Sequence, residues 1–305
     1  SDDSVSVTAT TGTLTVATVA AGTGNVTLEA TADALADDGA ATLISGGLVT
    51  LTSGVSIGAA GIEVDTAATQ LAAHVTGAGD VVITEEDGVE LLDVDTANGA
   101  ITIVTGNSAA GDVIITDVTS ANDADTISIT VGTGGNAEIG TINAGTGAGD
   151  VVLTLTAAAG QNVTDGDDNS LITADDVTIT ATGAIGTAEQ AINTTAAEWL
   201  AIASTTAGGI WVTETDSVTA TSVTTAAGPV VAGAGADIAL TSVTATGSDA
   251  TITAGDSITA DGAAGADVTA ETVNLIAENT IGAAGLVNYI GVNATEAVNA
   301  TADNS

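Results

Sequence analysis

Short runs in which apolar β-branched residues alternate with threonine or serine recur along the whole chain, separated by clusters of Gly, Ala, Asp and Asn. Alternation with a period of two, at this density of Val, Ile and Thr, is typical of strands rather than helices. Only residues 196–201 have a helix-like pattern, and strand residues flank them. The sequence therefore predicts an all-β protein. Examples of the runs are Val5-Ser6-Val7-Thr8, Leu14-Thr15-Val16, Val26-Thr27-Leu28, Ile101-Thr102-Ile103, Ile127-Ser128-Ile129 and Val177-Thr178-Ile179.

The chain also repeats itself over long intervals. Strand runs that begin at Val49, Val177 and Val273 are each followed, eight residues after the valine, by an Ile-Gly pair. Residues 49–104 resemble residues 177–233, and the motif returns at 273–284. Irregular repeats of short strands without intervening helices favour a parallel β-helix, in which each coil stacks about 4.8 Å above the last. We expect residues 1–305 to form a single β-solenoid domain, an elongated rod with roughly fourteen coils of ~20 residues.

The apolar composition indicates a thin interior. Hydrophobic residues make up 45% of the chain, yet Phe, Met and Cys are absent, and Trp199, Trp211 and Tyr289 are the only aromatic residues. A compact domain of this length usually anchors its core with large aromatic side chains. The interior is therefore expected to be only a few aliphatic side chains wide. No stretch approaches the ~18 apolar residues that a membrane span needs.

The charge is extreme, because the chain has 39 acidic residues and neither Lys nor Arg, for a formal net charge of −39. This excludes the basic surface with which proteins bind nucleic acid or an anionic membrane. It also removes the side chains that clamp phosphates and stabilise oxyanions. The partners that remain are cations or neutral surfaces, and calcium is the cation that carboxylate clusters favour.

One acidic loop has the pattern of a cation site. Asp165, Asp167, Asp168 and Asn169 place oxygen ligands around Gly166, which permits a sharp turn. The loop matches neither the twelve-residue EF-hand nor the glycine-rich nonapeptide of calcium-binding β-rolls. We predict a calcium site at these four residues, and the alternative is an ordinary solvated acidic loop.

Catalysis is not expected. His74 is the only imidazole, so a His-based triad would depend on it alone, and an exposed or corner histidine is the simpler interpretation. With no Cys and one His, a zinc site is not expected either. A lyase built on carboxylates would still need a basic group. The other acidic clusters considered are Glu85-Glu86-Asp87, Asp37-Asp38, Asp175-Asp176 and Asp123-Ala124-Asp125.

The two tryptophans allow two interpretations. Trp199 and Trp211 are twelve residues apart, a spacing that suits neighbouring strands and an aromatic shelf for a polysaccharide. The alternative is that they fill or cap the core.

One segment resembles a known family. Residues 177–188, Ala191-Ile192-Asn193 and residues 208–215 are similar to the repeats of very large secreted bacterial proteins related to filamentous haemagglutinin. The resemblance implies a right-handed parallel β-helix that forms the stalk of an adhesin, surface fibre or extracellular matrix component.

The sequence thus predicts a non-enzymatic extracellular structural protein. The strand pattern begins at Val5 and apolar residues continue through residues 292–299, so both ends are expected to contact another solenoid. The partner is a second copy in a head-to-tail homopolymer, or the flanking parent chain, with divalent cations bridging the charge. The alternatives are a surface-layer-type β-sandwich array and a polysaccharide-binding or polysaccharide-cleaving β-helix.

Overall fold

The computed structural model describes residues 3–39, 43–106, 111–122, 124–132, 134–156, 160–166, 169–206, 208–260, 265–282 and 289–303, without the side chains of residues 197–199 and 201. Across these residues the chain is all β and has no helix, and its parallel strands stack as a β-solenoid of about 12 turns. The predicted fold class is therefore confirmed. The chain divides into two compact units, Ser1–Ala157 and Ala158–Ser305. The single domain and the right-handed sense stay predictions.

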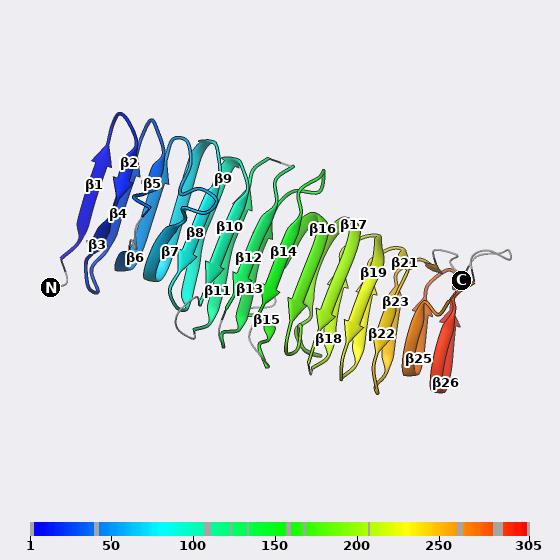
Figure 1. Ribbon diagram of the computed structural model, residues 1–305. Coiled ribbons are helices and arrows are strands. Elements are labelled where there is room, and N and C mark those ends of the chain that lie inside the picture. Colours follow the sequence, from blue (N-terminus) through cyan, green and yellow to red (C-terminus); the bar gives the residue numbers. More distant parts are fainter. Residues whose placement is uncertain are drawn as a thin grey trace. The chain divides into compact units, whose positions relative to one another are not determined.

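The strands of the first unit run from blue to green in Figure 1. They are β1 (Val5–Ala9), β2 (Leu14–Val16), β3 (Thr18–Ala20), β4 (Val26–Ala30), β5 (Leu35–Asp37), β6 (Leu43–Ser53), β7 (Val64–Ala78), β8 (Val81–Glu85), β9 (Val89–Asn98), β10 (Ile101–Thr105), β11 (Val113–Ser120), β12 (Ile127–Val131), β13 (Ala137–Asn143) and β14 (Val151–Leu155).

The second unit has the same architecture. Residues 196–201, the one helix-like segment of the sequence, lie inside strand β17, where ladders to neighbouring coils override the local helix preference of Ala, Glu and Leu. The strands are β15 (Val163–Asp165), β16 (Leu171–Ala181), β17 (Ile192–Ser204), β18 (Ile210–Glu214), β19 (Val218–Thr225), β20 (Val230–Ala234), β21 (Ile238–Leu240), β22 (Val243–Ala245), β23 (Ala250–Ala254), β24 (Ile258–Ala260), β25 (Val268–Ala277) and β26 (Val292–Ala302).

Within each unit, parallel ladders join neighbouring coils. Val5 pairs with Val26 on the following coil, and Val26 pairs with Val49. The coil length varies, since the step from Ile101 to its partner Ile127 is longer than the step from Val5 to Val26. The coils are thus longer on average than the expected ~20 residues, and there are about 12 turns rather than fourteen.

The interior is aliphatic, as the composition predicts. Inward side chains such as Val26, Leu28 and Ala30 alternate with outward polar ones, and the largest fully buried side chains are leucines and isoleucines. Each coil satisfies its backbone hydrogen bonds through its neighbours. Within the described residues no helical segment has the length and hydropathy needed to cross a membrane.

The glycine of the repeated Ile-Gly pair has the same backbone conformation in all three copies. Ile57 is fully buried and forms isolated bridges to the coils on either side. The following glycine has a left-handed backbone at Gly58, Gly186 and Gly282, with φ of 66°, 67° and 74°. A Cβ at Gly58 would lie 2.3 Å from the carbonyl oxygen of Val82. The motif therefore marks a corner that only glycine can form.

Candidate functional site

A cluster of polar side chains lies on the outer face of β7, β9 and β11. In these strands Ala73, Val94 and Val118 face the core, and the neighbouring positions that face outward are His74, Asp93, Asp95, Asp117 and Thr119. Register places Asp95 opposite His74, while Thr119 is opposite Asp95 on the other side.

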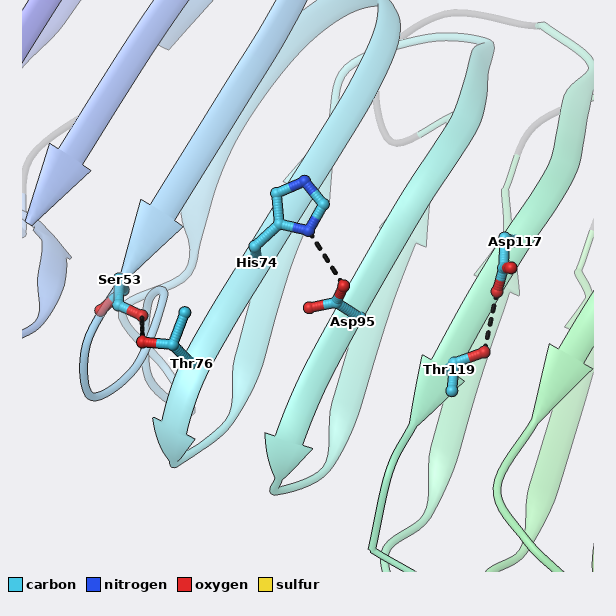
Figure 2. A network of polar contacts seen from close by, with 6 residues as sticks. All are labelled: Ser53, His74, Thr76, Asp95, Asp117 and Thr119. Carbon is cyan, nitrogen blue, oxygen red and sulfur yellow. Dashed lines mark hydrogen bonds and ion pairs between the residues drawn. The ribbon is translucent and has the colours of Figure 1, made fainter. Parts of the chain in front are cut away.

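The only histidine of the chain contacts an aspartate on the next coil. The Nδ1 atom of His74 lies 3.0 Å from Oδ2 of Asp95, and both side chains are partly exposed (Figure 2). Asp93 adds a second carboxylate to this pair. One possible ligand atom from each of His74, Asp93 and Asp95 lies within 4.8 Å of the other two. Among the described residues this is the one group of at least three His, Asp or Glu side chains so closely placed.

A β-bulge sets this arrangement. β7 and β9 pair Leu71 with Leu91, but the next pair is Ala72 with Asp93, because β9 carries one extra residue there. Without the bulge the register would shift by one residue and bring Val94 opposite His74. The bulge thus aligns two aspartates with the outer face of β7.

A hollow of about 400 Å³ lies beside the cluster, and its wall includes Asp93, Asp95 and Asp117. Asp117 comes from β11, where the hydroxyl of Thr119 donates a hydrogen bond of 2.8 Å to it (Figure 2). Three carboxylates therefore line one concave surface.

The predicted calcium loop is described only in part. Asp165 ends β15 and is buried, with its Oδ2 accepting a 2.6 Å hydrogen bond from the hydroxyl of Ser170, whereas Asn169 is exposed. Asp167 and Asp168 lie outside the described residues. The calcium site at these four residues stays a prediction.

One residue of the acidic cluster at 85–87 faces the core. Glu85 is fully buried at the end of β8, and it accepts a 2.6 Å hydrogen bond from the hydroxyl of Thr66 and a 3.1 Å bond from the N–H of Ala68. Burial raises the pKa of Glu85 to about 7, although these hydrogen bonds oppose the shift. Glu85 therefore serves the interior of the solenoid and is not part of an exposed cation site.

The terminal strands present open edges. β1 pairs with β4 and β26 pairs with β25, and no further ladder covers either strand among the described residues. Val7 stacks on Leu28, which is 1% exposed, yet Val7 itself is 40% exposed. Val298 likewise stacks on the buried Val273 and is 53% exposed. The aliphatic stack is thus uncovered at both strands.

The two tryptophans belong to different ladders. Trp199 is opposite Thr219 on β19, whereas Trp211 is opposite Val231 on β20. The side chain of Trp199 lies outside the described part. Trp211 lines a hollow of about 550 Å³, and its ring covers Gly209 so closely that a Cβ there would lie 2.4 Å from it.

No family model, curated protein or solved structure matches this chain.

The acidic partners of His74 were missed in the sequence. Its near neighbours along the chain do not include them, since Asp80 is the first acidic residue after His74. The relevant neighbour lies one coil away, and the step from His74 to Asp95 is the same as the step from Val5 to Val26 on paired strands. A search at coil spacing would have found the pair.

Proposed function

We propose that this chain is a non-enzymatic structural protein, a solenoid segment of an extracellular adhesin, filament or matrix that assembles end to end. The observation that carries the proposal is the uncovered aliphatic stack at both terminal strands, with Val7 and Val298 exposed where their partners one coil inward are buried. Exposed apolar side chains on an open strand edge favour pairing with another strand. The extracellular setting comes from the resemblance of residues 177–188 and 208–215 to adhesin repeats.

The proposed occupant of each open edge is a second copy of the chain, and the alternative is the flanking parent chain. The ladders joining coils are parallel, so β26 of one copy placed against β1 of the next continues the same pattern. Such a contact is head to tail and does not close, so it produces a filament. Because the chain carries −39 charges and no Lys or Arg, divalent cations assist assembly by reducing repulsion.

The test is sedimentation velocity with electron microscopy, in the presence and absence of calcium. Val298→Asp places a charge on the uncovered stack and should convert end-to-end oligomers to monomers. Thr301→Asp is the matched control, because Thr301 pairs with the exposed Ile276 on the outward face of β26 and the added charge is identical. Equal oligomerisation of the two variants, or a wild-type chain that stays monomeric at all concentrations, would contradict the homopolymer.

The edge of β1 offers an independent variant. The N–H of Val5 donates to Asn25 and the carbonyl of Ala9 accepts from Thr31, so the backbone groups of Thr8 face away from β4. Thr8→Pro removes a donor from the open edge and should weaken assembly. Thr8→Val keeps that donor and should assemble as the wild type does.

Polysaccharide binding is a second candidate, supported by the hollow beside Trp211. The chain's charge would repel acidic polymers, so a neutral glucan is the appropriate probe. Binding should change tryptophan fluorescence and be lost in Trp211→Ala. Trp199→Ala is the control, because Trp199 lies on a different ladder from Trp211.

A further inference from the structure

We infer that His74, Asp93 and Asp95 form a site for one divalent transition-metal ion on the outer face of the first unit. The cluster is independent of end-to-end assembly, because its residues lie on β7 and β9 and not on a terminal strand.

The distances suit a shared ion. Imidazole nitrogen and carboxylate oxygen bind zinc-like ions at about 2.0–2.2 Å, so two ligands of one ion lie at most about 4.4 Å apart. The ligand atoms of His74, Asp93 and Asp95 already lie within 4.8 Å of one another, and Nδ1 of His74 is 3.0 Å from Oδ2 of Asp95. Rotation of partly exposed side chains is enough to close the remaining difference.

The donor set selects the class of metal. One imidazole nitrogen with carboxylate oxygens suits zinc, copper, nickel and related ions, whereas calcium and magnesium prefer oxygen alone. The chain has no Cys and one His, and from this the sequence predicts no zinc site. In the structure, however, aspartates supply the further ligands. The hollow lined by Asp117 leaves room for water to complete the coordination.

The electrostatics favour a bound cation. Asp93 and Asp117 directly precede the paired Val94 and Val118, so two like charges occupy equivalent positions on adjacent strands. Like charges in this relationship destabilise a sheet. The chain has no Lys or Arg to offset them, and His74 is its only histidine. A divalent ion between the strands neutralises this negative charge, which no side chain other than His74 could neutralise.

The single imidazole makes the site directly observable. The experiment uses the whole chain without a histidine tag, stripped of metal, in 0.15 M sodium chloride at neutral pH, a salt level that leaves a Debye length of about 8 Å. Calorimetry with zinc chloride should show one strong site per chain. The ¹⁵N imidazole spectrum should show one ring nitrogen shifted by coordination, and calcium chloride should leave that spectrum unchanged.

Matched variants separate a site from general charge effects. His74→Gln and Asp93→Asn should each weaken zinc binding by at least about tenfold, because loss of even an outer-shell partner of a ligand typically costs about 10–100-fold in affinity. Glu90→Gln removes one carboxylate from β9, where Glu90 accepts a hydrogen bond from Gln70, and should leave the affinity within about twofold. Thermal melts of all three variants check that they fold.

Three results would overturn the inference. The first is that zinc does not bind at one equivalent, and the second is that it binds without altering the imidazole spectrum. The third is that Asp93→Asn and Glu90→Gln reduce the affinity equally. In each of these cases His74 and Asp95 form an ordinary hydrogen-bonded pair.

Discussion

Glu85 and Glu214 occupy the same structural position in two copies of the repeat. Each ends a strand, is at most 1% exposed, and accepts a 2.6 Å hydrogen bond from a threonine one coil earlier, Thr66 or Thr194. Each also accepts a backbone hydrogen bond two residues beyond that threonine, from Ala68 or Ala196. Burial raises the pKa of both carboxyls.

The first prediction concerns pH. The pKa of Glu85 is about 7 in the folded chain and 4.5 for an ordinary glutamate, so the folded state holds this proton more tightly. The resulting stability is fully present below pH 4.5 and is lost as pH rises through 7, a loss of about 3 kcal/mol. Urea unfolding at pH 5 and pH 8 measures it.

Glu85→Gln should flatten this part of the pH profile. Glu86→Gln removes an adjacent exposed carboxylate and should keep the wild-type slope. If both variants show the same pH dependence, general charge repulsion controls stability and Glu85 does not.

The second prediction concerns the threonine donors. Thr66→Val removes the hydroxyl that stabilises ionised Glu85, and should lower the free energy of unfolding at pH 8 by about 1–3 kcal/mol. It should also raise the pKa of Glu85 further, because a hydrogen bond that lowers this pKa is lost. Carboxyl ¹³C titration detects that rise. An unchanged titration would show that the hydroxyl has no effect on the charge.

The equivalent pair of Thr194 and Glu214 allows the same test at a second site. Thr194→Val should act on Glu214 in the same direction. Thr195→Val is the control, since the Thr195 hydroxyl bonds the exposed Thr215 hydroxyl, and it should change stability by no more than about 0.5 kcal/mol.

The strands could be predicted from the sequence because alternation of apolar and polar side chains is a local signal. The same alternation predicts that Glu85 points into the core, because it lies two residues after the buried Ile83. Treating Glu85, Glu86 and Asp87 as one acidic cluster ignores this alternation of inward and outward positions. The buried carboxyl was therefore predictable, although it was not predicted.

Contacts between coils could not be read from the sequence in the same way. Coil lengths differ, since the step from Val230 to Ala250 is shorter than the step from Ile101 to Ile127. The partner of a given residue therefore depends on the lengths of the turns and on bulges such as the one before Asp93. The pair of His74 and Asp95 could be sought at coil spacing, but the bulge that aligns Asp93 with the same face is known only from the structure, so the three-residue site could not be predicted.

The third prediction concerns the corner glycine of the repeat. Gly58→Ala adds a Cβ 2.3 Å from the carbonyl oxygen of Val82 at a φ of 66°. Gly61→Ala also requires a left-handed backbone, with φ of 79°, but its Cβ meets nothing within 4 Å. Gly61→Ala should cost about 1 kcal/mol, and Gly58→Ala should cost at least about 2 kcal/mol more. Thermal unfolding of the two variants gives the difference, and equal costs would mean that the corner relaxes.

The last prediction separates specific calcium binding from screening. Bringing 39 carboxylates together without basic residues costs self-repulsion, which any salt reduces. If Asp165, Asp167, Asp168 and Asn169 bind calcium, calcium chloride should raise the melting temperature more than sodium chloride of equal ionic strength. Asp168→Asn should remove this excess, whereas Asp303→Asn, which removes an exposed carboxylate elsewhere, should keep it. Equal effects of the two salts on the wild-type chain would leave screening as the sole action of calcium, because only a specific site distinguishes the ions at matched ionic strength.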